Sequence, residues 1–86
     1  MMPPPQVTPW ADTLDVSVDV DIAAQVHVDT AQDFTPTAGT YRMTLYGPGT
    51  VHVMGLPPGI DHYVRLVSID GGDMSAPSDP VQTTAL

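Results

Sequence analysis

Apolar and polar residues alternate along most of this chain. The clearest run lies at residues 14–22, LDVSVDVDI, in which every even position is apolar and every odd position is polar. Successive side chains of a β-strand point to opposite faces, so this run predicts a strand with one face in the core and one in solvent. Shorter alternating segments predict further strands within 6–11, 25–29, 41–46, 50–54, 62–69 and 80–84. No segment has the period of a helix.

Glycine and proline mark the connections between these strands. Gly47-Pro48-Gly49 predicts a tight turn that joins 41–46 to 50–54 as a hairpin. Residues 31–40 are rich in Thr, Pro and Gly and predict a loop, with one short strand around Phe34. Short alternating strands with turns of this kind are typical of an antiparallel β-sandwich.

The stretch from residue 50 to residue 84 resembles the fibronectin type III family. In that family a strand ends in Gly-Leu, a Pro-Gly corner follows, the next strand opens with an aromatic residue, and a Gly-containing loop leads to Ser-x-Pro-Ser. The matching residues here are Gly55-Leu56, Pro58-Gly59, His62-Tyr63, Gly71-Gly72 and Ser75-Ala76-Pro77-Ser78. The resemblance implies a seven-stranded antiparallel, immunoglobulin-like sandwich. It also implies a module without chemistry of its own, which acts as a spacer, an adhesion unit or a recognition platform.

The resemblance also implies roles for the corner residues. Leu56 should close the core where its strand meets the corner, and Pro58 and Gly59 should turn the chain toward the other sheet. His62 aligns with the family's corner tyrosine, and a ring nitrogen could make the same bond to the backbone. The chain departs from the family in lacking the tryptophan of the second strand, while Trp10 comes too early and suggests a repacked N-terminal edge.

Length and charge restrict the organisation and the partners. The chain has 86 residues, enough for one domain, which we divide into a Pro-rich lead-in at 1–5 and a sandwich at 6–86. All ten acidic residues are Asp, and two Arg and no Lys leave a net charge of −8. This balance argues against nucleic acid and against an anionic membrane, since both need clustered cations. Residues 1–5 have neither the basic segment nor the apolar core of a secretory signal, so we expect a protein made without a signal peptide. No apolar run is long enough to span a membrane.

The residue types also argue against catalysis and cofactors. The chain has no Cys, Glu or Lys, and no Gly-x-Ser-x-Gly motif. Its three histidines, His27, His52 and His62, fall on strands that should keep them apart, so we expect no histidine metal site. For calcium, the candidates are Asp70 and Asp73, which flank the Gly71-Gly72 turn, with no motif behind them. We therefore predict a protein that is not an enzyme and has no cofactor.

One surface stands out as a candidate for binding. If strands 25–29 and 62–69 lie side by side, their outward residues form an interaction face of Gln25, His27, Tyr63, Arg65, Val67 and Ile69. A solvent-facing strand of a monomer seldom carries Tyr, Val and Ile together. The alternative is a register slip of one residue, which would turn Tyr63, Val67 and Ile69 inward and bury Arg65.

These observations predict a structural or binding module that docks by protein–protein contacts. The setting we expect is a larger particle, as a head-decoration or tail component of a bacteriophage virion. The alternative is an accessory fibronectin type III or carbohydrate-binding module of a secreted bacterial enzyme or adhesin. Sugar binding would need a row of aromatic residues, and those available, Trp10, Tyr41, Tyr46 and Tyr63, are spread over different strands.

Overall fold

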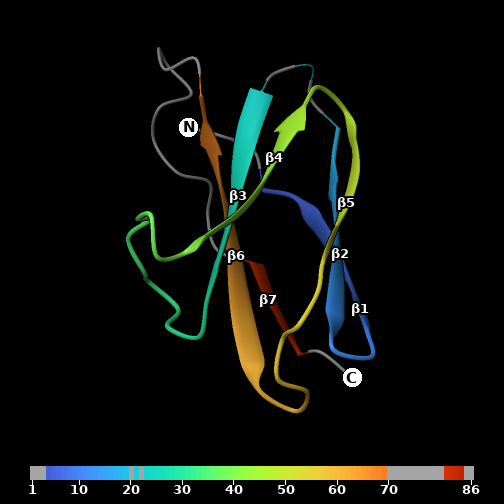
Figure 1. Ribbon diagram of the computed structural model, residues 1–86, viewed down its shortest axis with the longest axis vertical. Helices are drawn as coiled ribbons and strands as arrows, with labels where there is room; N and C mark the ends of the chain where they lie inside the picture. The colour runs from blue at the N-terminus through green and yellow to red at the C-terminus, as the bar shows by residue number, and fades with distance from the viewer. Residues whose placement is uncertain (1–3, 20, 22, 70–80, 85–86) are drawn as a thin grey trace.

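The chain forms two antiparallel β-sheets, as expected for a β-sandwich. The computed structural model describes residues 4–19, 21, 23–69 and 81–84, and within these ranges it contains seven strands and no helix. The strands are β1 (Gln6–Trp10), β2 (Thr13–Val18), β3 (Ala23–Asp29), β4 (Tyr41–Tyr46), β5 (Gly49–Val53), β6 (Asp61–Ser68) and β7 (Val81–Thr84). One sheet has the order β1-β2-β5 and the other β4-β3-β6-β7 (Figure 1). Among the described residues no helix could cross a membrane.

The predicted hairpin between β4 and β5 is wrong. These strands belong to different sheets, and the short connection at Gly47 and Pro48 carries the chain from one sheet to the other. Gly47 has a φ of 87°, which an L-residue adopts only under strain, so glycine permits this abrupt change of direction. Leu45 and Val51, on either side of the connection, both pack against the core between the sheets.

The run at 14–22 is a shorter strand than its pattern predicts. β2 ends at Val18, and Asp19 and Asp21 belong to the connection to β3. The partner strand explains this end, because Val18 pairs with Gly49, the first residue of β5, and no partner continues beyond it. Alternation alone shows where side chains would point, but a strand also needs a neighbour to pair with.

The core lies between the two sheets and consists of their inward-facing apolar residues. It comprises Leu14, Val16, Val18, Ala24, Val26, Val28, Val53, Leu56, Val64 and Leu66. The predicted lead-in at 1–5 lies partly outside the described residues, and its last residue, Pro5, is buried.

The corner after β5 follows the prediction. Leu56 is 2% exposed and belongs to the core, and its backbone N–H donates to the Asp12 carbonyl over 2.9 Å. Pro58 and Gly59 lie in a turn, with Gly59 at a φ of 75°, after which the chain enters the other sheet as β6. His62 is buried, and its Nδ1 lies 2.9 Å from the Ile60 carbonyl oxygen, to which it donates.

Candidate interaction face

The outer face of the four-stranded sheet carries the residues of the predicted interaction face. In β6, His62, Val64, Leu66 and Ser68 are buried, so the alternating residues point outward and the alternative register is wrong. Of the outward residues, Tyr63, Arg65 and Val67 are half-buried and Ile69 is 45% exposed.

The outward side chains form rows across β4, β3 and β6, because residues opposite one another in antiparallel strands share a face. The first row is Tyr46, Ala23 and Ile69, the second is Thr44, Gln25 and Val67, and the third is Tyr41, His27 and Arg65. The pairing of β3 with β4 shifts between Val26 and His27, and this bulge brings Tyr41 opposite His27. Beyond the third row, Asp29 pairs with Tyr63.

The chain itself covers part of this face. The segment 31–40 forms no strand around Phe34, contrary to the prediction; it is a loop that leads from the end of β3 to the start of β4 and lies to one side of β6 in the view of Figure 1. Phe34 is 6% exposed, although it does not belong to the core between the sheets. Arg65 explains the position of Phe34. Nη1 of the guanidinium donates to the Phe34 carbonyl over 3.0 Å, and Cζ lies 5.9 Å from the centre of the Phe34 ring. Arg65 therefore holds the loop against the sheet.

His27 is buried rather than open to a partner, which corrects the expectation that it contributes an exposed side chain. Its ring points outward from β3 but lies under the loop, with 4% of its surface exposed. Nδ1 is 2.8 Å from the Thr40 hydroxyl and Nε2 is 3.1 Å from Oε1 of Gln25. Tyr41 packs edge-on against the imidazole, with 5.9 Å between the ring centres.

Burial also determines the protonation of His27. Removal of the ring from water lowers its pKa below the ordinary value of 6.5, and a hydrogen bond to the backbone of Thr37 opposes this shift. The cationic Arg65 lies opposite on β6. A neutral ring has one donor and one acceptor nitrogen, and the Thr40 hydroxyl and Oε1 of Gln25 are the groups that these nitrogens face.

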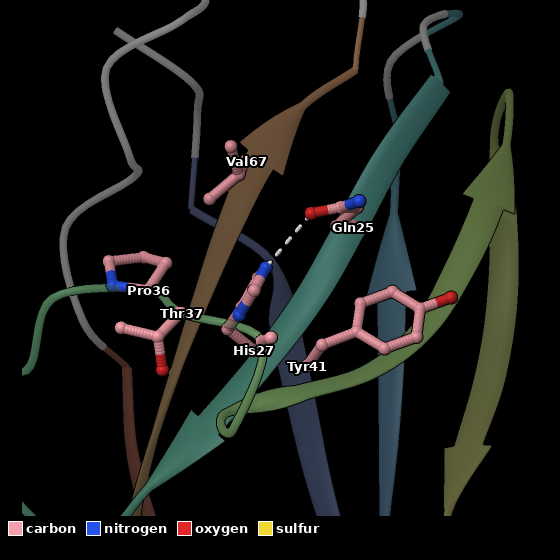
Figure 2. Close-up of a pocket in the computed structure, with 7 residues that line it drawn as sticks. Gln25, His27, Pro36, Thr37, Tyr41 and Val67 are labelled. Carbon is pink, nitrogen blue, oxygen red and sulfur yellow. Dashed lines mark hydrogen bonds between the residues drawn. The ribbon is translucent and has the colours of Figure 1, made fainter.

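A shallow, open hollow lies between the loop and the strands. Its volume is about 490 Å³, and it is lined by Gln25, His27, Pro36, Thr37, Ala38, Tyr41 and Val67. Figure 2 shows Pro36 and Thr37 of the loop on one side of His27, Tyr41 on the other, and Gln25 and Val67 on neighbouring strands. With His27 neutral, no lining side chain carries a charge. The hollow can therefore receive an apolar or aromatic group and offer it one hydrogen bond from the Gln25 amide.

The sequence did not predict the loop side of this hollow. Pro36, Thr37 and Ala38 have no periodicity that would place them on the sheet. Tyr41 alternated with Arg42 in the expected strand, but its position opposite His27 depends on the bulge. The one available signal was Phe34, a single large apolar residue in a polar loop, which indicates a loop that packs against something.

The outer face of the other sheet has a different character. Asp15, on the central strand β2, accepts a hydrogen bond from the Trp10 indole N–H over 2.7 Å and also contacts Nδ1 of His52. Trp10 is 55% exposed. The tryptophan and the three tyrosines therefore lie on opposite sheets, and they do not form the single row that sugar binding would need.

Within the described residues no group of three His or Asp side chains could hold a metal ion. His27 and His52 lie on the outer faces of different sheets, and His62 is buried at the corner. The calcium candidates Asp70 and Asp73 lie outside the described residues.

Comparison of the chain with models of known protein families, with curated proteins and with solved structures gave no significant match. The argument for function therefore rests on the face described above.

Proposed function

We propose that this chain is a fibronectin type III-like module, without catalytic activity, that docks on another protein through the outer face of β4, β3 and β6. Two sheets of three and four antiparallel strands, and the corner at Leu56 to His62, support the fold part of this proposal. The docking part rests on the chemistry of the face.

The observation that carries the proposal is the distribution of charge. The chain has ten Asp residues, yet the segments 23–27, 41–46 and 62–69, which form the three rows, contain none. Asp15 lies on the other sheet, Asp12, Asp19 and Asp21 lie in connections, Asp29 and Asp61 lie at strand ends, and Asp33 lies in the loop beside Phe34. The centres of protein interfaces are depleted in charged residues, so three rows without an acidic residue on a strongly acidic protein fit a docking surface.

The exposed side chains of the face also suit a protein partner. Tyr46 is 80% exposed, Ile69 45% and Tyr41 41%, although all three are large and apolar or aromatic. Aromatic residues dominate binding energy where they meet pockets that exclude water. The hollow beside Tyr41 and Val67 would take a complementary side chain of the partner.

The proposed contact set differs from the set that the sequence predicted. Gln25, Val67 and Ile69 remain, and Tyr41 and Tyr46 join them. Arg65 acts through the loop, because its guanidinium binds the Phe34 carbonyl and ring. His27 forms the floor of the hollow. Tyr63 lies beyond the third row, beside Asp29, and is not part of the set.

The setting that we propose is a larger protein assembly, with a bacteriophage virion as the specific case. A strongly acidic module without cysteine would bind there by this face, whose three rows contain no acidic residue, and keep its other surfaces solvated. Neither nucleic acid nor a membrane is a partner in this proposal, since two arginines cannot supply a basic surface.

A charge placed on the face tests the proposal. Ile69→Asp adds a carboxylate to an exposed position of the face, where a docked partner would remove it from water at a high cost in free energy. This variant should be displaced from its native assembly, as measured by co-sedimentation with particles from the source organism. Thr8→Asp makes the same change of charge at an exposed position of the three-stranded sheet and should leave co-sedimentation unchanged. Equal behaviour of the two variants would refute docking through this face.

A further inference from the structure

The free edge of β4 differs from the other three sheet edges. β1 contains Pro9, which blunts an edge. β7 is four residues long and lies beside β1. β5 has five residues. β4 has six residues and contains neither proline nor a carboxylate, and Arg42 is its only charged residue. Natural proteins protect exposed edges with prolines, charges, bulges or short strands. β4 is the longest of the four edge strands, and its protection is limited to Arg42 and the bulge near Tyr41.

The pairing of the sheet shows which backbone groups of β4 face outward. The Ile69 N–H donates to the Ala23 carbonyl, so Ala23 and Gln25 direct their backbone groups toward β6. Ala24 and Val26 therefore direct theirs toward β4, where their partners are Leu45 and Met43. Because successive residues of a regular strand alternate in this respect, the N–H and C=O groups of Thr44 and Tyr46 point to the free edge. Arg42 lies at the bulge, where this alternation does not hold.

Besides the exposed Arg42, this edge has three large apolar or aromatic side chains that are accessible. Tyr41, Met43 and Tyr46 are 41%, 37% and 80% exposed. Tyr41, Thr44 and Tyr46 also begin the three rows of the proposed docking face, so a strand added at β4 would extend that face without a break.

We infer that β4 accepts an extended segment of a cationic partner protein as an additional strand of its sheet. The N–H and C=O groups of Thr44 and Tyr46, which face the edge with no neighbouring strand among the described residues, supply the hydrogen bonds, as in other cases of strand addition. Charge determines the partner: a second copy of this chain would bring together two molecules of net charge −8, whereas a basic protein is attracted. The Asp21 carboxylate lies beside Gly47, directly after β4, where a basic residue of the added strand would meet it. This inference rests on the proposed docking function and specifies its mode.

The structure provides a variant that blocks the edge without breaking the sheet. Thr44→Pro removes an N–H group that faces the free edge and leaves the bonds of Met43 and Leu45 to β3 in place. Thr44→Val is the matched control, because it keeps the N–H. The Thr44 hydroxyl lies 2.7 Å from the Tyr41 hydroxyl, and both variants lose this contact. A difference in binding between the two variants therefore reports the loss of the backbone N–H.

The probe is a short synthetic peptide of alternating valine and lysine with blocked ends, compared with the same peptide carrying glutamate in place of lysine. We expect the lysine peptide to bind the protein and to slow amide hydrogen exchange at Thr44 and Tyr46 by at least about tenfold. Thr44→Val should retain this binding and Thr44→Pro should lose it, with the circular dichroism spectrum of both unchanged. The glutamate peptide should not bind.

Absence of binding, or equal binding to Thr44→Pro and Thr44→Val, would overturn the inference. Co-sedimentation of the Thr44→Pro variant separates this result from the proposed function. If this variant remains on the assembly while Ile69→Asp is released, docking through the face stands and strand addition is wrong. If Ile69→Asp also remains, the docking face itself is wrong.

Discussion

Truncation of Leu56 tests the packing on which the whole face depends. Leu56 lies directly before the corner, is 2% exposed, and closes the core beside Val53 and the buried residues of β6. Leu56→Ala leaves the backbone and its hydrogen bond to Asp12 available, so the change acts on packing alone.

The size of the effect follows from the atoms removed. Leu→Ala deletes three carbon atoms, which at about 0.8 kcal/mol for each buried methylene amounts to about 2.4 kcal/mol. An unfilled cavity raises the loss, and fully buried leucines cost about 2.7–5.0 kcal/mol when truncated. Since the corner can relax partly toward the space, we expect about 3 kcal/mol. This is a large share of the 5–15 kcal/mol that is typical of small domains.

Urea denaturation followed by tryptophan fluorescence measures this loss, because Trp10 is the single tryptophan of the chain. Met54→Ala is the control, since Met54 lies two residues earlier and is 70% exposed; its effect should stay within about 0.5 kcal/mol. A loss below about 1 kcal/mol for Leu56→Ala, or equal losses for both variants, would refute the assigned position of the corner.

Two further predictions concern the buried histidines. His62→Ala should destabilise the fold by about 1–3 kcal/mol, because the Ile60 carbonyl loses its partner and a cavity forms, whereas His62→Tyr should be tolerated; chemical denaturation of both variants checks this. Because burial lowers the pKa of His27 below 6.5, His27 binds a proton more readily in the unfolded chain than in the folded protein. The free energy of unfolding should therefore rise with pH between the lowered pKa of His27 and a pH just above 6.5. The His27→Gln variant lacks this group, so its free energy of unfolding, subtracted from that of the unchanged protein at each pH, should leave this rise. A difference that is constant with pH would contradict the prediction.

The presence of strands and the direction of their side chains could be predicted, because both depend on the local alternation of apolar and polar residues. The register of β6 is an example: His62 to Ser68 alternate between core and surface as the pattern requires. The turn at Pro58 and Gly59 was also predictable from residue type, whereas the position of Leu56 was predicted from the resemblance of residues 50–84 to fibronectin type III modules. These features need no knowledge of which strands are neighbours.

The features that were missed depend on contacts between distant segments. Gly47-Pro48-Gly49 has the composition of a hairpin turn, and only the pairing of β5 with β2 shows that the chain crosses between sheets there. Likewise, Arg65 and Phe34 are 31 residues apart, and their contact brings the loop over the face and buries His27. An alternating pattern gives the direction of a side chain but not what another part of the chain places over it.

A structure of the protein bound to its native assembly tests the docking claim most directly. The proposal predicts that the outer face of β4, β3 and β6, with Tyr46, Ile69 and the hollow beside Val67, is covered by the partner, while Trp10 and the three-stranded sheet remain in solvent. Partner contacts confined to the three-stranded sheet, with Tyr46 and Ile69 open to solvent, would contradict it.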